Sequence, residues 1–335
     1  MNVIYARNVN DALVKGVKLI KALGRNIDPR GMMTLEVPTP VATVYQNPCE
    51  RVLLYPERDA NPFFHFFESL WILAGWQDVK FLAQFNSKIA EYSDNGVVFH
   101  APYGFRLKYA FGTDQLQKAV DMFKHDHRTR RVALQIWDTN LDLGADSKDI
   151  PCNDFIMLKL RNSLLNMTVC CRSNDIIWGC YGANAVQFSV LLEYLAAKIG
   201  CHVGTYTQIS DSFHAYVDQD AWKRCADLEV AQPYEDHPSR KDECVRSFPL
   251  VRNADAFDAE LFRFLHDMED EMVRMFPHYV YVNSFFPCVA IPMYRAWTLY
   301  KKKDMEGAIQ TLEDECQASD WRKAGTEWLQ RRIKN

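Results

Sequence analysis

A cysteine preceded by proline, Cys152, is the strongest candidate for chemistry in this sequence. It stands in Ile150-Pro151-Cys152-Asn153, at the start of a predicted strand. A cysteine in this setting is by itself more often a core residue. Arg172 ends the predicted partner strand, however, and a hairpin would bring its guanidinium close to Cys152. A neighbouring positive charge favours the thiolate over the thiol, and the thiolate is the nucleophile.

Arginines give the second signal, because guanidinium forks suit phosphate oxygens. Arg130 and Arg131 directly precede an apolar strand, and Arg172 lies on the predicted hairpin. A solvated basic turn is the plain alternative and is sufficient for Arg128. It explains the two arginines next to the strand less well. The chain has a net charge of -4 at pH 7, so an anionic substrate must be held by a local cluster of this kind.

Three polar features complete the set of candidates. The segment 179–184 opens a helix, where the backbone can approach a ligand closely, although Asn184 can equally be a helix cap. His214 and Tyr216 end a strand and point to one side of it at period two, a pattern that alone is more often core. Glu68 is a lone acid in an apolar helix, so burial is expected to raise its pKa.

The elements that must position these residues mix helices and strands, which indicates an α+β fold with helices covering one mixed sheet. Asn162 and Ser163 are predicted to form the turn of a hairpin. The short segment 32–46 is expected to be extended. Apolar periodicity predicts helices at 9–23, 61–76, 114–125 and 184–199, and strands at 131–137, 155–161, 164–171 and 203–210.

The last third of the chain has a different character. Residues 230–248 are polar and contain two prolines, which indicates a surface loop. Helical patterns follow at 255–275, 289–303, 305–315 and 318–333. We therefore expect a catalytic core at 1–225, a polar connecting loop at 226–254 and a helical C-terminal extension at 255–335.

Composition narrows the class of protein. Hydrophobic residues make up 48% and charged residues 24% of the 335 residues, which is ordinary for a globular protein. The ten cysteines form no pair with zinc-like spacing, so reduced thiols and no metal are expected. No signal peptide, membrane span or nucleic-acid partner is indicated. The expected location is the cytoplasm, of a host cell if the protein is viral.

Taken together, the candidate residues resemble the family of thymidylate synthase and the related pyrimidine nucleotide hydroxymethylases. The resemblance covers about residues 10–220 and includes the order and approximate spacing of the motifs. These motifs are Glu68-Ser-Leu-Trp71, Tyr103-Gly104, Arg130-Arg131, Pro151-Cys152, Arg172-Ser173-x-Asp175, Gly179, Asn184 and His214-x-Tyr216.

The resemblance implies a covalent mechanism. Cys152 would add to C6 of the pyrimidine, after which C5 attacks the iminium form of 5,10-methylenetetrahydrofolate, the expected co-substrate. Glu68 would organise proton transfers through water, with Tyr103 as a partner. Asp175 would contact the pterin and take part in catalysis, and Asn153 is counted among the catalytic residues.

The resemblance also implies how the ligands are held. Arg172 and Ser173 would bind the phosphate, together with Arg130 and Arg131 from the second subunit of a homodimer. Asn184 would read the base edge. His214 and Tyr216 would contact the sugar 3′-hydroxyl. The remaining candidates are Arg30 and Asn174 for substrate and Trp71 and Gly179 for the cofactor.

Departures from the family pattern bear on the product. Asn153 replaces a histidine and Cys171 a glutamine, Ser212 stands where an aspartate is usual, and the 179–184 loop is one residue longer. The chain continues for roughly a hundred residues past the matched core instead of ending in a short apolar tail that closes over the folate. A dry site permits hydride transfer and a methyl product, whereas an ordered water gives a hydroxymethyl product. Asn153 would offer a polar amide able to hold that water.

We therefore expect 5-hydroxymethylation, with reductive methylation as the alternative. An asparagine reads either base by flipping its amide. Asn184 alone leans to uracil, but the longer loop can shift Ala183 into its place, and dCMP is placed slightly ahead of dUMP. An inactive nucleotide- or RNA-binding relative is a remote alternative. A thiol hydrolase using Cys152 and His214 would leave the arginines unexplained.

Overall fold

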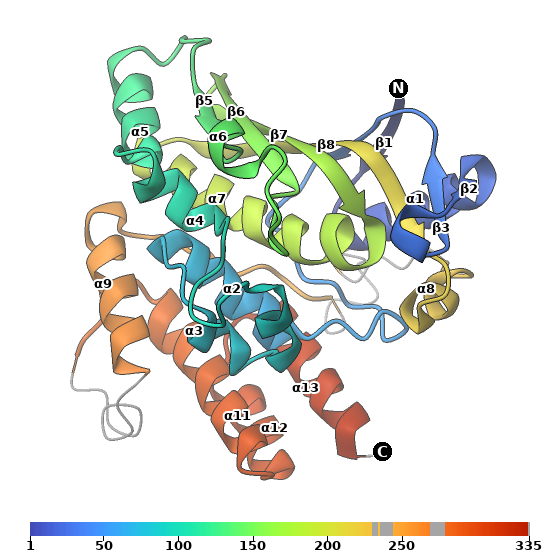
Figure 1. Ribbon diagram of the computed structural model, residues 1–335. Helices are drawn as coiled ribbons and strands as arrows, with labels where there is room; N and C mark the ends of the chain where they lie inside the picture. Colours follow the sequence, from blue (N-terminus) through green and yellow to red (C-terminus); the bar gives the residue numbers. More distant parts are fainter. Residues whose placement is uncertain (230–233, 235–243, 269–278, 334–335) are drawn as a thin grey trace.

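The fold is a single mixed sheet with helices packed on one face (Figure 1). The structure is a computed structural model, and it describes residues 1–229, 234, 244–268 and 279–333. The main strand order is β1-β4-β8-β7-β6-β5, while β3 pairs with both β2 and β8. The strands are β1 (Asn2–Ala6), β2 (Arg25–Ile27), β3 (Thr34–Val37), β4 (Val41–Tyr45), β5 (Ala133–Gln135), β6 (Asn153–Arg161), β7 (Leu164–Asp175) and β8 (His202–Tyr216).

The helices begin and end at residues suited to those positions. Asn8 caps the first helix by accepting hydrogen bonds from two backbone N–H groups, and Asn61 with Pro62 starts the second. Gly75 ends that second helix in the left-handed conformation. The α-helices are α1 (Val9–Leu23), α2 (Pro62–Ala74), α3 (Val79–Ala83), α4 (Tyr103–Phe105), α5 (Gln115–His125), α6 (Thr139–Asp142), α7 (Asn184–Ile199), α8 (Asp220–Cys225), α9 (Ala254–Asp267), α11 (Ile291–Lys301), α12 (Met305–Glu315) and α13 (Ser319–Ile333).

Tighter and wider helical turns join several of these elements. Two are 3-10 turns, at Pro29–Gly31 and Ser87–Tyr92. Three are π-helical, at Arg106–Ala110, Ile176–Ala183 and Phe286–Ala290. The π-helical segment at 176–183 is kinked at Tyr181 and Gly182, so the chain enters α7 through an irregular turn rather than a simple cap.

The sheet is organised around β7. An antiparallel hairpin joins β6 to β7, and α7 crosses over to β8, which runs parallel to β7. Asn162 and Ser163 both have positive φ, of 51° and 61°, as the predicted hairpin turn requires. The predicted strand at 131–137 is shorter than expected, because only Ala133–Gln135 pair with β6.

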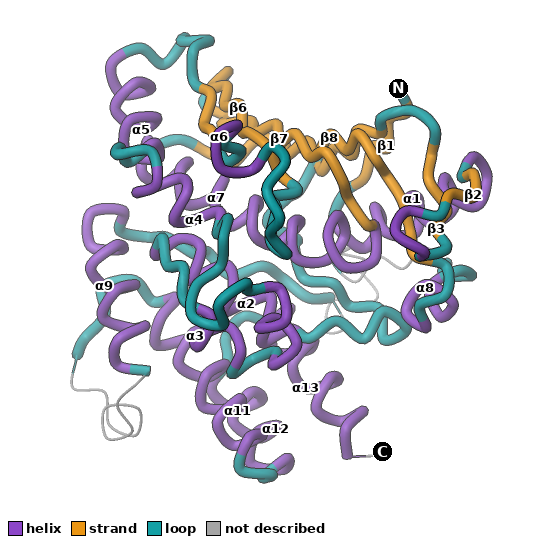
Figure 2. The backbone as a smooth tube through the Cα atoms, viewed as in Figure 1, coloured by secondary structure: helices purple, strands orange, loops and turns teal. Residues whose placement is uncertain are grey.

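The two faces of the sheet differ. Helices α1 and α7 lie against one face, whereas no described element covers the other (Figures 1 and 2). Large apolar side chains are exposed on this open face, including Tyr5 at 64% and Phe155 and Met157 at 40% each. Phe155 and Met157 lie two residues apart on β6, and exposed apolar side chains on an uncovered sheet face are typical of an interface with another protein chain.

The C-terminal helices share their core with α2. Phe63 of α2 lies 5.3 Å from Trp297 of α11 and 5.7 Å from Trp328 of α13, measured between ring centroids. Phe66 packs edge-on against Trp321 at 5.1 Å. The predicted helix at 255–275 runs at least to Asp267, and its later residues, like most of the predicted loop at 230–248, lie outside the described residues. No helix in the described ranges has both the length and the apolar character needed to cross a bilayer.

Candidate active site

The hairpin brings Arg172 beside Cys152, as the sequence predicted. The backbone N–H of Arg172 donates to the Cys152 carbonyl at 2.9 Å. Its guanidinium donates to the carbonyls of Pro151 at 2.9 Å and Ile150 at 3.1 Å. The Cys152 thiol is partly exposed and Arg172 is exposed, so both remain accessible to a ligand. The arginine thus fixes the peptide before the nucleophile while keeping its charge at the surface.

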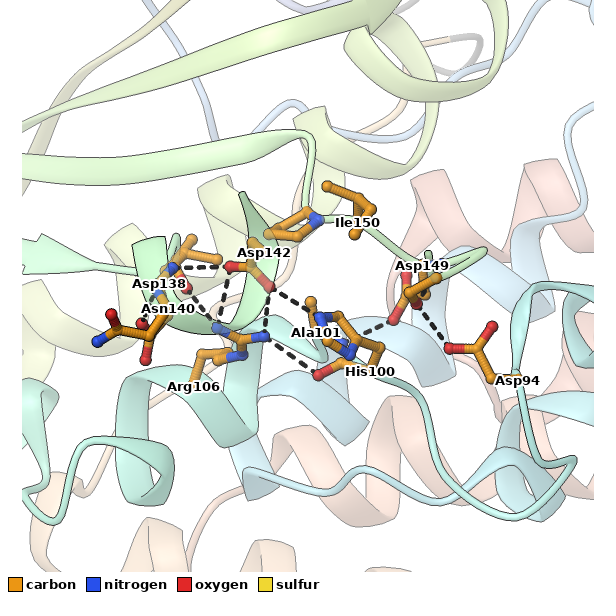
Figure 3. Close-up of polar contacts among 12 residues, drawn as sticks. Asp94, His100, Ala101, Arg106, Asp138, Asn140, Asp142, Asp149 and Ile150 are labelled. Carbon is orange, nitrogen blue, oxygen red and sulfur yellow. Dashed lines mark hydrogen bonds and ion pairs between the residues drawn. The ribbon is translucent and has the colours of Figure 1, made fainter. Parts of the chain in front are cut away.

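A buried ion pair holds the loop that leads to Cys152 (Figure 3). Arg106 donates to both carboxyl oxygens of Asp142, at 2.8 and 3.1 Å. His100 Nε2 lies 2.8 Å from Asp142 Oδ1. Burial alone would raise the pKa of Asp142, but hydrogen bonds from the Asp138 backbone and from Arg106 hold it below its usual value. The carboxylate is therefore charged, and it ties α6 to the π-helical turn at Arg106–Ala110.

A second carboxyl group, Asp149, anchors the same loop three residues before the nucleophile. Asp149 Oδ2 accepts a hydrogen bond of 2.9 Å from the Ala101 backbone N–H. Burial raises the pKa of Asp149 to about 6. These anchors are not apparent from the sequence, because nothing local links Asp142 or Asp149 to partners more than thirty residues earlier.

Behind the nucleophile, buried amides converge from four elements, β6, β7, α7 and β8. Asn153 Nδ2 donates to the Tyr103 hydroxyl at 3.1 Å and to Asn184 Oδ1 at 3.3 Å. Asn184 Nδ2 in turn donates to Asn174 Oδ1 at 3.2 Å. Four predicted site residues are thus brought together, and Asn184, not Ala183, occupies the first position of α7 facing them. Gln208 also joins them by donating to Asn153 Oδ1 at 3.0 Å.

The contacts of Asn153 limit how it could hold a water molecule, the role expected of it from the sequence. Asn153 is fully buried, and both hydrogens of its amide are taken by Tyr103 and Asn184. Because Gln208 occupies one lone pair of its oxygen, only one polar position remains. Asn153 therefore links Tyr103, Asn184 and Gln208 to one another.

Glu68 has the properties expected of a proton-transfer group. It is 9% exposed on α2, and burial raises its pKa to about 7, although a hydrogen bond to Gln187 opposes that shift. Its Oε2 atom has no hydrogen-bond partner among the described residues. Gln187 lies three residues after Asn184, so Glu68 meets the same face of α7 as the amide group.

Asp175, His214 and Tyr216 meet where β7 and β8 end. Asp175 accepts hydrogen bonds from the backbone N–H groups of Ile177 and Trp178, at 3.3 and 2.9 Å. Burial raises the pKa of Asp175. It lies opposite His214 in the strand register, and the His214 and Tyr216 rings are 5.2 Å apart, on one side as predicted.

Arg130 and Arg131 lie apart from this group. Because Ala133 pairs with Met157, the two arginines stand near the end of β6 that is far from Cys152. Both are exposed, and they line an open surface cavity of about 840 Å³ with Arg128 and His125. Neither has an ion pair within the described ranges of this chain. The structure therefore does not bring them into the site of their own subunit.

The remaining candidates differ in their settings. A Cβ at Gly179 would lie 2.9 Å from Asn174 Oδ1, so glycine is needed beside the amide group. Trp71 is only 3% exposed, packs on Phe99 and donates to Asp78, which makes it a core residue rather than the expected cofactor contact. Arg30 belongs to the turn Pro29–Gly31, and its side chain lies outside the described part of the chain. The described residues contain no cluster suited to a metal ion.

A partly exposed thiol beside an arginine, with several buried amides and a buried acid of raised pKa, is an arrangement suited to nucleophilic catalysis by cysteine. Comparison with known proteins agrees. The thymidylate synthase family model matches residues 43–239, more than half of the chain. The chain belongs to the thymidylate synthase family. Its reaction is accordingly a folate-dependent transfer of one carbon to C5 of a pyrimidine nucleotide.

Individual relatives are similar over different lengths. The deoxyuridylate hydroxymethyltransferase of Pseudomonas phage M6 is 39% identical over 99% of this chain and 95% of its own length. The protein of the same name from Bacillus phage SP01 is 41% identical over 62% of this chain and 56% of its own. A putative thymidylate synthase of Methanothermobacter marburgensis is 30% identical over 64% of this chain and 92% of its own.

Proposed function

We propose that this enzyme hydroxymethylates C5 of dUMP, with 5,10-methylenetetrahydrofolate as the one-carbon donor and water as the source of the hydroxyl oxygen. The observation that carries the proposal is the similarity over nearly the whole chain to a deoxyuridylate hydroxymethyltransferase. The presence of Asn184, not Ala183, in the amide group supports uracil as the base. This reverses the order of dCMP and dUMP favoured by the sequence alone.

Cys152 is proposed as the nucleophile that adds to C6 of the base. Arg172 and Ser173 are proposed to hold the phosphate, since Arg172 keeps an exposed guanidinium next to Cys152. His214 and Tyr216 are proposed to bind the sugar. Asn184 is proposed to read the base edge, because its amide keeps one free hydrogen and one free lone pair beyond its contacts with Asn153 and Asn174.

Glu68 is proposed to position water and to move protons. A carboxyl group with a pKa of about 7 exchanges a proton readily at neutral pH. Its Oε2 atom is buried and lacks a partner among the described residues, which suits a bound water. Tyr103, whose pKa is raised by burial, stays protonated and serves as a hydroxyl partner.

Asp175, Trp178 and Gly179 are proposed to hold the folate. Each carboxyl oxygen of Asp175 accepts one backbone hydrogen bond, which leaves lone pairs for the N–H groups of a pterin. Trp178 is 52% exposed and offers an aromatic surface, while Gly179 leaves room for a close approach. 5,10-Methylenetetrahydrofolate supplies the carbon that is transferred.

A homodimer is proposed to complete the phosphate site. The open sheet face exposes Tyr5, Phe155 and Met157, which suits contact with a second copy of the chain. Arg130 and Arg131 are unused in their own subunit, and a partner offers them a phosphate to bind.

The product assay tests the proposal. The enzyme is incubated with dUMP and 5,10-methylenetetrahydrofolate. The mass of the nucleotide product is measured by mass spectrometry, and formation of dihydrofolate is followed by its absorbance. We expect 5-hydroxymethyl-dUMP and no dihydrofolate. A 5-methyl product with stoichiometric dihydrofolate would instead identify a methylating synthase, and no conversion of any pyrimidine nucleotide would refute the proposal as a whole.

A further inference from the structure

The amides behind Cys152 belong to a longer chain of hydrogen bonds that runs in one direction. The Tyr206 hydroxyl donates to Gln208 Oε1, and Gln208 Nε2 donates to Asn153 Oδ1 at 3.0 Å. From Asn153 the chain continues through Asn184 to Asn174. Asn174 Nδ2 then donates to Ser210 Oγ at 2.9 Å, and Ser210 is in turn hydrogen-bonded to the Cys180 thiol. Every amide in it therefore accepts on one side and donates on the other.

Because these side chains are buried, every hydrogen bond in the chain has to be made. Gln208, Asn153 and Ser210 are 0% exposed, and Tyr206 is 1% exposed. Water does not replace a lost partner at such positions, so each unpaired amide would be destabilising. Reversing one amide would set two donors or two acceptors against each other. The amides must therefore reverse together or not at all.

Tyr206 gives the chain its direction. Among the described residues, Gln208 is the one hydrogen-bond partner of the Tyr206 hydroxyl. A phenol with a single buried partner donates its proton, since accepting would leave that proton unpaired. Gln208 must then present its oxygen to Tyr206 and its amide nitrogen to Asn153, and this order is passed on to Asn184.

We propose that Tyr206 and Gln208 determine which base the enzyme accepts, by fixing the orientation of the Asn184 amide. The inference rests on the proposed function. Uracil presents N3–H as a donor and O4 as an acceptor, whereas cytosine presents N3 as an acceptor and its amino group as a donor. Exchanging the oxygen and nitrogen of Asn184 therefore exchanges one base for the other. Tyr206 and Gln208 are positioning residues, because they act through Asn153 and Asn184.

The substitution Gln208→Glu reverses the chain by design. In its ionised form the carboxylate has no proton to donate, so Asn153 turns its amide nitrogen toward residue 208 and its oxygen toward Asn184. Burial raises the pKa of this carboxyl group, so the ratio is measured at the upper end of the pH range in which the enzyme is folded. Asn184 and Asn174 then reverse in turn, and the Ser210 hydroxyl donates. The measured quantity is the ratio of kcat/KM for dUMP to kcat/KM for dCMP. We expect the ratio to move at least tenfold toward dCMP, because a site that hydrogen-bonds one pattern rejects the other strongly.

Tyr206→Phe is the second variant, and it keeps the ring that stacks on Tyr45 at 5.0 Å. Without the phenol proton the chain loses the donor at its Tyr206 end, so the ratio should fall at least tenfold toward equal use of the two nucleotides. Ser189→Ala is the matched control, because it removes a buried hydroxyl whose one hydrogen bond to the described residues is to the Val186 carbonyl of its own helix. Its ratio should equal that of the wild type.

The outcomes separate the two proposals. If the folded Gln208→Glu and Tyr206→Phe proteins lose activity equally on both nucleotides, the ratio is unchanged and the inference is overturned. If Gln208→Glu does not fold, the ratio of the Tyr206→Phe enzyme decides alone. If the wild type converts neither dUMP nor dCMP, the proposed function fails instead.

Discussion

Glu68 is a buried acid with one carboxyl oxygen that accepts no hydrogen bond from the described residues. Such a group costs stability when it ionises, because a charge in an apolar setting loses its hydration. At a position with a purely structural role, an apolar residue would avoid this cost. The position of Glu68 against Gln187, on the face of α7 that carries Asn184, supports the role in proton transfer proposed for it.

The free-energy cost of ionising Glu68 in the folded protein is measurable as a pH dependence of stability. Its folded pKa of about 7 lies above its unfolded value, so the unfolded chain loses the proton first as pH rises. Wild-type stability should therefore fall, relative to Glu68→Gln, between about pH 4.5 and pH 7, by about 3 kcal/mol in total. Urea unfolding of both proteins at several pH values measures this. The exposed Glu91→Gln is the control, and an equal slope for wild type and Glu68→Gln would contradict the burial argument.

Substitutions of Cys152 should abolish turnover without abolishing nucleotide binding. Cys152→Ala removes the nucleophile but leaves Arg172 in place, so we expect turnover to vanish while dUMP affinity changes less than tenfold. Cys152→Ser should be almost as inactive, because a hydroxyl is far less ionised at neutral pH. Calorimetric titration with dUMP and a product assay measure the two effects. Substantial product from Cys152→Ala would exclude the covalent mechanism.

At the scale of elements, the loop before Cys152 depends on the buried pair of Arg106 and Asp142. Removing one partner of a buried pair leaves an uncompensated charge, which typically costs 3–5 kcal/mol. We expect Asp142→Ala to lose about that much stability. Asp220→Ala is the matched control, since its pair with Lys223 is exposed and 3.8 Å long, and should cost less than about 1 kcal/mol. Equal costs in thermal or urea unfolding would show that the loop does not depend on this pair.

The same loop shows what the sequence could and could not predict. Local patterns predicted α1, the hairpin turn at Asn162 and Ser163, and the meeting of Arg172 with Cys152, because each depends on residues close in sequence or on a short turn. The anchors Arg106 and Asp142 depend on a contact across 36 positions, and no local pattern marks such a pair. Gln208 was also missed, although it lies on β8 at an even spacing from His214 and so shares its face of the strand.

For the whole molecule, the active site and the C-terminal helices share one structural support. The α2 helix carries Glu68, and its Phe63 and Phe66 are buried by Trp297, Trp321 and Trp328. Asp59, in the segment before α2, is held by Arg331 and Arg332 at the end of α13. The predicted helical extension therefore supports the segment that positions the proposed acid, whatever further role it has.

The assembly of two such molecules gives the last prediction, which follows from the separation of Cys152 and Arg131 along β6. Cys152→Ala and Arg131→Ala chains should each be inactive alone. In a mixed dimer, the site that keeps Cys152 receives the intact Arg131 of the other chain. Random exchange makes half of the dimers mixed, with one complete site in each, so activity should recover to about a quarter of the wild-type level. Subunit exchange is followed by native mass spectrometry and product formation in the same samples. If mixed dimers form and remain inactive, the arginines do not serve the neighbouring subunit, and a phosphate site built from one chain would be required.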